Sequence, residues 1–168
     1  FESDRLTPLG EGHQKRSFIN PDDEGRIILE TKEGEQKDTP RQLKGRYYLT
    51  KIVHLLLPDN IPDVYQARES SDGKQTVDTE RISHTPEHTR LQEARKAGDN
   101  EEPARKQIME KMGEKLGDLD LKLSDLGLGL NIDGNVGNYT QDEVGNVHYL
   151  ETFEPWNLNP TDPGSSEL

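Results

Sequence analysis

The sequence of residues 26–57, RIILETKEGEQKDTPRQLKGRYYLTKIVHLLL, predicts a β-strand followed by an α-helix. Residues 27–29 are three adjacent branched apolar residues, which is typical of a strand. Pro40 is suited to the first turn of a helix, and Pro58, just after the segment, ends it. Six of the apolar residues between the two prolines have helical spacing, so they predict one buried helix face: Leu43, Tyr47, Tyr48, Ile52, Leu55 and Leu56.

Further strands are predicted on both sides of this segment. Residues 16–19 form a strand candidate, and the acidic turn at residues 20–25 joins it to the strand at residues 26–32 as a hairpin. After the helix, residues 64–67 and 75–82 are strand candidates around a glycine-containing turn. The first half of the chain therefore predicts an antiparallel sheet with one helix packed on it.

The second half of the chain predicts helices and a second hairpin. Residues 86–96 and 103–116 have helical patterns, whereas residues 118–130 alternate in a way that fits either a strand or an irregular helix. Two short strands around residue 143 form the hairpin. The whole chain is thus expected to be α+β, with domains at residues 1–82 and 83–156 and a polar tail at residues 157–168.

Composition excludes several classes of protein. The chain has 168 residues, a net charge of −12 and only 29% hydrophobic residues. No apolar run approaches the ~20 residues that span a bilayer, so no membrane partner is expected. The absence of cysteine excludes disulfides and thiolate zinc sites. The negative charge argues against nucleic acid as a partner. Because the polar opening residues resemble no signal peptide, a cytoplasmic location is expected.

The most informative motif is residues 131–138, NIDGNVGN, together with the hairpin that follows it. Asp133 precedes Asn138 by five residues, and Glu151 lies just beyond the hairpin. This order resembles the catalytic segment of the protein-kinase-like phosphotransferases. The resemblance implies that Asp133 orients the hydroxyl of the acceptor and that Asn138 and Glu151 hold Mg²⁺.

Upstream residues follow the same resemblance. Gly10 and Gly12 correspond to the glycine-rich loop that covers the phosphates of ATP, and Lys32 corresponds to the lysine that pairs with a phosphate. The resemblance spans residues 6–156 in the order of its elements. It implies a kinase-like fold, with a small antiparallel sheet and one helix in the first lobe and a reduced helical second lobe that carries the catalytic-type hairpin.

Departures from the kinase pattern leave alternatives open. The third glycine of the phosphate loop is missing near Lys15, and no Asp or Glu between Pro40 and Pro58 could pair with Lys32. The sequence therefore fits an atypical ATP- and magnesium-dependent kinase of unknown acceptor. It also fits an inactive pseudokinase-like protein or another acidic α+β module that binds a protein partner. A piece of a longer kinase-like protein is a further alternative.

Two metal-binding patterns compete with the kinase interpretation. Asn131, Asp133 and Asn135 alternate like the first ligands of a calcium loop, although Val136 stands where such a loop needs glycine. His84 and His88 are four residues apart, the helical spacing of two metal ligands, but no third ligand is evident.

Overall fold

The computed structural model describes residues 5–12, 14–83, 102–130 and 138–158. The chain divides into two compact units. The first unit comprises residues 1–82 together with residues 151–155, and the second comprises residues 83–150 together with residues 156–168. The five residues after the late hairpin therefore belong to the sheet-containing unit.

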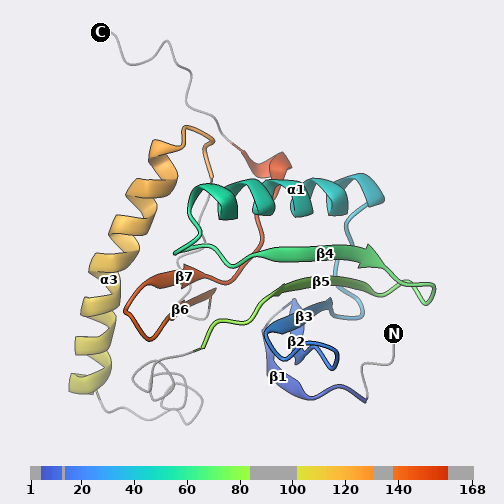
Figure 1. Ribbon diagram of the computed structural model, residues 1–168, viewed down its shortest axis with the longest axis horizontal. Coiled ribbons are helices and arrows are strands. Elements are labelled where there is room, and N and C mark those ends of the chain that lie inside the picture. The colour runs from blue at the N-terminus through green and yellow to red at the C-terminus, as the bar shows by residue number, and fades with distance from the viewer. Residues whose placement is uncertain (1–4, 13, 84–101, 131–137, 159–168) are drawn as a thin grey trace, which may run out of the picture. The chain divides into compact units, whose positions relative to one another are not determined.

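A five-stranded antiparallel sheet forms the first unit, as Figure 1 shows. The sequence prediction of an α+β fold with an antiparallel sheet is confirmed. The spatial order β1-β2-β3-β5-β4 places β1 and β4 at the two edges. The strand bounds are β1 Pro8–Glu11, β2 Lys15–Ile19, β3 Arg26–Thr31, β4 Val64–Glu69 and β5 Gln75–Glu80.

Helix α1, Pro40–Leu56, lies along β4 (Figure 1). It begins where the sequence predicts, because Thr39 and Gln42 form a capping box: the backbone N–H of Gln42 donates to the hydroxyl of Thr39, and the Gln42 side chain accepts from the Thr39 N–H. Pro40 occupies the first turn, where no intrahelical N–H bond is needed. Local capping therefore fixes the start of α1.

The core of the first unit lies between α1 and the sheet. Leu29 of β3 pairs with Val77 of β5, and Val77 pairs with Ala67 of β4, so the three side chains share one sheet face. They pack with Leu43 of α1 in the buried cluster, together with Val64 and Tyr47.

The predicted buried face of α1 is wrong in part. Tyr48, Ile52, Leu55 and Leu56 were expected to be buried, but they are 55%, 50%, 69% and 53% exposed. The residues of α1 that are buried are Leu43, Arg46, Leu49, Thr50 and Val53. The helix is therefore rotated so that an arginine and a threonine face the interior.

Residues 151–155 explain this rotation, because they pack against α1. The backbone N–H of Phe153 donates to Oγ1 of Thr50 at 3.0 Å, and the Phe153 side chain is buried. A Cβ atom at Gly45 would lie 3.1 Å from Cγ of Pro155, so glycine permits the close approach of this segment. The polar side of α1 thus holds an extended segment that is distant in sequence.

The second unit contains α3, Glu102–Asp125, and the hairpin of β6, Tyr139–Gln141, and β7, Val147–Tyr149. The sequence pattern of residues 118–130 fitted either a strand or an irregular helix. In the structure, α3 extends into this segment and ends at Asp125. Leu119 and Leu123, one helical turn apart, are both 1% exposed. Several sequence predictions lie outside the described residues: the helix at residues 86–96, the pair His84 and His88, and the calcium-like loop. Within the described ranges, no helix is both long and apolar enough to cross a membrane.

Asp142 holds the turn of the β6–β7 hairpin. Its Oδ1 accepts hydrogen bonds from the backbone N–H groups of Val144 and Asn146, and its Oδ2 lies 2.8 Å from Nε2 of His148. Burial disfavours the charged carboxylate, but the His148 contact and these backbone bonds outweigh it and lower the pKa of Asp142. The turn is therefore stabilised by an ionised aspartate.

Asp78 of β5 is buried on the sheet face opposite α1. It is 7% exposed, and its Oδ1 has no hydrogen-bond partner among the described residues. Burial raises the pKa of Asp78, and the positive charges of Arg68 and Arg26 only partly offset this effect. The ionised form of this carboxylate therefore destabilises the folded state.

Asp78→Asn is expected to raise the free energy of unfolding at pH 7 by about 1 kcal/mol, at the low end of the cost of an unpaired buried acceptor. Because the folded-state pKa is raised, stability falls as pH rises from the unfolded-state pKa through the folded-state pKa. The gain should therefore vanish near pH 3, where both states carry neutral Asp78. Urea denaturation at the two pH values measures this difference, with the exposed Asp22→Asn as the control; equal gains at both pH values would contradict the explanation.

Candidate functional site

Lys15 and Glu151 form an ion pair in the first unit. Nζ of Lys15, at the start of β2, lies 2.9 Å from Oε2 of Glu151. The two side chains are 21% and 37% exposed, so the pair is partly shielded and still open to solvent. The predicted magnesium ligand Glu151 therefore lies against a cation that the sequence analysis did not select.

Lys32 lies elsewhere. Its Nζ is 2.6 Å from Oε1 of Glu11, and hydrogen bonding with Lys32 lowers the pKa of that carboxylate. Lys15 pairs with Thr31 across β2 and β3, which puts Lys15 on the face of Thr31. Lys32, one residue further along, projects from the opposite face. The structure therefore does not bring Lys32 to Glu151.

Gly10 and Gly12 lie in the β1–β2 hairpin beside Lys15. The backbone N–H of Gly12 donates to the carbonyl of Lys15 at 2.9 Å. Gly10 pairs with Ser17, whose hydroxyl donates to the Gly10 carbonyl at 3.1 Å. A glycine-containing hairpin, an ammonium group and a carboxylate are thus gathered at one end of β2.

The β6–β7 hairpin returns the chain to Asn138. The backbone N–H of Leu150 donates to the carbonyl of Asn138 at 2.7 Å, and Glu151 is the next residue in the chain. This backbone contact follows from the closed hairpin that the sequence predicts. Asp133, the predicted catalytic residue, lies outside the described residues, and its role stays a prediction.

Arg46 is the residue near this site that the sequence analysis missed. Its Nε and Nη2 contact both carboxylate oxygens of Asp38, at 2.7 and 3.1 Å. Nη1 donates to Oγ1 of Thr152 at 2.9 Å, and Nη2 also donates to Oε1 of Glu154 at 3.0 Å. These contacts anchor the residues that directly follow Glu151.

Burial of Arg46 opposes its charge, but the hydrogen bonds and charges of Asp38 and Glu154 outweigh burial and raise the pKa of Arg46. The guanidinium is therefore permanently charged and fully engaged. No local sequence signal could identify it, because Thr152 and Glu154 are more than a hundred residues away in the chain.

The metal-binding capacity of the site depends on a nucleotide. No group of three or more acidic, histidine or cysteine residues that could hold a metal occurs in the described part of the chain. Magnesium in nucleotide sites needs only one or two carboxylates, since phosphate oxygens and water complete its coordination. Lys15 contacts only one carboxylate oxygen of Glu151, and the Glu151 side chain is partly exposed. The Glu151 carboxylate is therefore a chemically suitable ligand for a phosphate-bound magnesium ion.

Comparison of the sequence with models of known protein families found no match, and comparison with curated proteins found none either.

Proposed function

We propose that this chain binds ATP with Mg²⁺ at the β1–β2 end of its sheet and acts as an atypical kinase-like phosphotransferase. The observation that carries the proposal is the 2.9 Å pair between Lys15 and Glu151 beside the glycine-containing hairpin. Lys15 takes the phosphate-binding role that the sequence pattern suggests for Lys32. Glu151 keeps its predicted role as a magnesium ligand.

The chemistry of the pair suits a magnesium nucleotide. An ammonium group offers three donors to phosphate oxygens, and a carboxylate is a preferred magnesium ligand. When the nucleotide binds, Lys15 exchanges the Glu151 carboxylate for phosphate oxygens, and Glu151 exchanges the Lys15 ammonium group for Mg²⁺. Neither charge is then left buried without an opposite charge beside it. Gly10 and Gly12 carry no side chain that would keep phosphates from the hairpin backbone. The roles of Asp133 and Asn138 remain those expected from the sequence.

A catalytically silent binding module is the second candidate. It is favoured by the fact that Lys15 and Glu151 satisfy each other without a ligand, as a purely structural ion pair does. It is also favoured by α1, which has no acidic residue to pair with a phosphate-binding lysine. The two candidates differ in one measurable property, magnesium-dependent binding of nucleotide.

A thermal-shift titration separates these candidates. A ligand at ten times its dissociation constant stabilises the folded state by about 1.4 kcal/mol. For a chain of this size, we therefore expect about 5 mM ATP with excess Mg²⁺ to raise Tm by about 3–5 °C. Mg²⁺ alone should leave Tm unchanged, and ATP with EDTA should give less than half of the shift. The same Tm with and without MgATP would reject the phosphotransferase proposal in favour of the silent module.

A further inference from the structure

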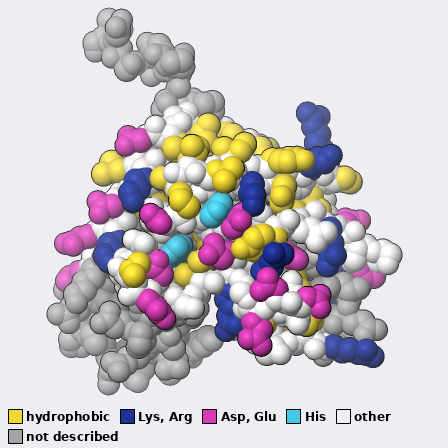
Figure 2. Space-filling model, in the orientation of Figure 1, with side chains coloured by type: hydrophobic (Ala, Val, Ile, Leu, Met, Phe, Trp, Pro, Cys, Tyr) yellow, Lys and Arg dark blue, Asp and Glu magenta, His cyan; other side chains and the backbone are white. Residues whose placement is uncertain are grey.

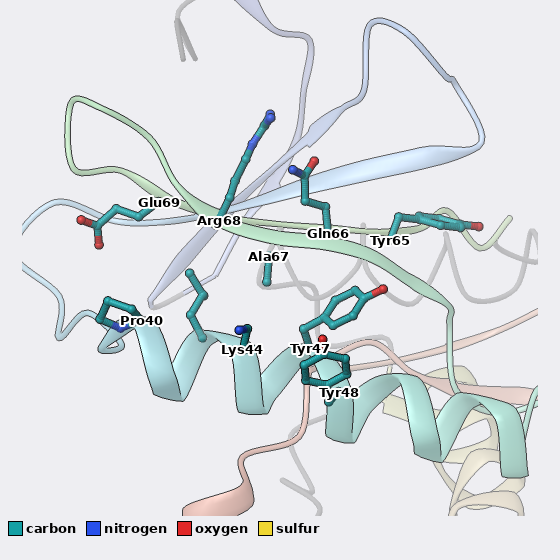
Figure 3. A pocket seen from close by; sticks show the side chains of 10 residues that line it. Pro40, Lys44, Tyr47, Tyr48, Tyr65, Gln66, Ala67, Arg68 and Glu69 are labelled. Atoms are coloured by element: carbon teal, nitrogen blue, oxygen red, sulfur yellow. The ribbon is translucent and has the colours of Figure 1, made fainter.

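A groove of about 410 Å³ runs between α1 and the edge strand β4 (Figure 3). Tyr47, Tyr48 and Leu43 line it from α1, and Ala67 lines it from β4. Its floor is therefore largely apolar and aromatic. All of its lining residues belong to the first unit, and none of them belongs to the proposed nucleotide site.

Strand β4 offers its backbone at this groove. It pairs with β5 along one edge and with no other strand in the described ranges. In an antiparallel strand, the N–H and C=O groups of alternate residues point to the outer edge. Such an edge next to a helix-lined groove can accept an extended peptide as an added strand, with peptide side chains entering the groove.

The electrostatics of the groove identify the chemistry of its occupant. The chain carries a net charge of −12, yet α1 contains four basic residues and no acidic residue. Lys44 of α1 and Arg68 of β4 line the groove, and neither has a carboxylate within ion-pairing distance in the described structure. The acidic residue of the groove, Glu69, is already held by Nε2 of Gln75 at 2.8 Å. The groove is thus bordered by two cationic side chains and one carboxylate, and Arg68 is the cation on the face of β4 opposite α1.

The two faces of β4 indicate which kinds of side chain a bound peptide would carry on each of its own faces. Figure 3 shows Ala67 pointing toward α1, whereas Gln66 and Arg68 point to the other side of the strand. A peptide strand added beside β4 would likewise alternate. Its side chains on the α1 side would meet Tyr47 and Tyr48, and those on the other side would meet Arg68. We propose that this groove binds an extended segment of a partner protein in which apolar and acidic residues alternate.

Exposed apolar side chains continue along α1 beyond the groove. Tyr48 is followed along α1 by Ile52, Leu55 and Leu56, all at least half exposed. Figure 2 shows hydrophobic side chains gathered over α1. Contiguous exposed apolar side chains of this kind mark interaction surfaces. A partner that adds a strand to β4 can therefore bury further apolar surface on α1.

The test uses the full chain and a fluorescein-labelled octapeptide of alternating isoleucine and glutamate. We expect saturable binding in fluorescence anisotropy, with changes in NMR amide shifts concentrated in β4. Arg68→Glu should weaken binding about fivefold, the scale of one exposed ion pair, because Arg68 lies on the face of β4 that the acidic peptide side chains would share. The matched control Arg16→Glu, an equal charge change at the exposed position of β2, should alter the dissociation constant by less than about twofold.

Two control peptides probe the mode of binding. A peptide of alternating isoleucine and lysine should bind at least about fivefold more weakly, because its lysines would face Arg68. A version methylated at every second backbone nitrogen should lose binding, because it cannot pair with β4. Equal affinity for all three peptides, or equal affinity of wild type and Arg68→Glu, would overturn the proposal.

Other occupants give distinct outcomes. If a peptide of residues 159–168 bound at the same place and as tightly as the isoleucine–glutamate peptide, the groove would belong to the chain's own tail. If sedimentation showed a dimer that Arg68→Glu dissociates, the groove would belong to a second copy. Either result overturns the inference of a separate partner. Neither depends on nucleotide binding, so the proposed function is tested independently.

Discussion

Replacing Arg46 with methionine is expected to lower the free energy of unfolding by about 3–5 kcal/mol, the cost of removing one partner from a buried ion-pair network. Arg46 is only 8% exposed, and Asp38 would lose the two guanidinium contacts that neutralise it. Thr152 and Glu154 would lose their contacts with α1 at the same time. Methionine retains most of the side-chain volume, so the loss reports on polar contacts rather than on a cavity.

Urea denaturation of the wild type and the variant measures this loss. Lys44→Met is the matched control, because it removes one positive charge from an exposed position of the same helix and should change stability by less than about 0.5 kcal/mol. Losses of similar size in the two variants would show that helix charge, and not the Arg46 network, controls stability.

The Arg46 network also connects stability to the candidate site. Thr152 directly follows Glu151, so the hydrogen bond from Arg46 to the Thr152 hydroxyl anchors the residue next to the proposed magnesium ligand. The N–H of Phe153, one residue further on, is fixed by Thr50. Arg46 and Thr50, about one turn apart on α1, therefore hold residues 152–154, which lie outside helices and strands. The proposed ligand is positioned by a helix rather than by a flexible loop.

The elements of the first unit could be predicted because their signals are local. Branched residues at 27–29 favour a strand, and the sequence Thr39-Pro40 before an apolar pattern favours a helix start. Each of these signals depends on neighbours within a few residues. Strands β2 to β5 and the start of α1 appear in the structure where these signals lie, whereas β1 was not predicted.

The orientation of α1 could not be predicted, because it depends on distant partners. The six apolar residues chosen from the sequence favour the face of Tyr48, Ile52 and Leu55, and they leave out Leu49 and Val53, which are buried. The structure instead buries Arg46 and Thr50, whose polar groups are satisfied by residues 152–154. A buried arginine is stable only when its partners are present, and those partners lie over a hundred residues away. Local periodicity therefore gives the helix but not its buried side.

The sequence could not distinguish between Lys15 and Lys32 for a similar reason. The sequence pattern places a lysine at the end of the second strand, and Lys32 fits that position. A strand has a side-chain period of two, so one residue decides which sheet face a side chain occupies. Pairing of Lys15 with Thr31 settles the face only after β2 and β3 are aligned. Motif order alone could not supply that register.

Lys15→Met is expected to weaken binding of MgATP by about 10- to 100-fold. The basis is the loss of one charge-assisted phosphate contact, worth about 1.5–3 kcal/mol. Lys32→Met removes the same charge from the same sheet, but Lys32 is paired with Glu11 on the opposite face. It should change the dissociation constant by less than about twofold. The two variants remove the same charge, and they differ in the sheet face and in the carboxylate that loses its partner, Glu151 or Glu11.

Isothermal titration of MgATP into the wild type, Lys15→Met and Lys32→Met is the most direct test of the nucleotide site. The proposal predicts measurable binding to the wild type and to Lys32→Met, and a loss of at least about tenfold for Lys15→Met. Loss with Lys32→Met and retention with Lys15→Met would restore the assignment based on sequence order. No heat of binding in any of the three proteins would contradict the nucleotide site itself.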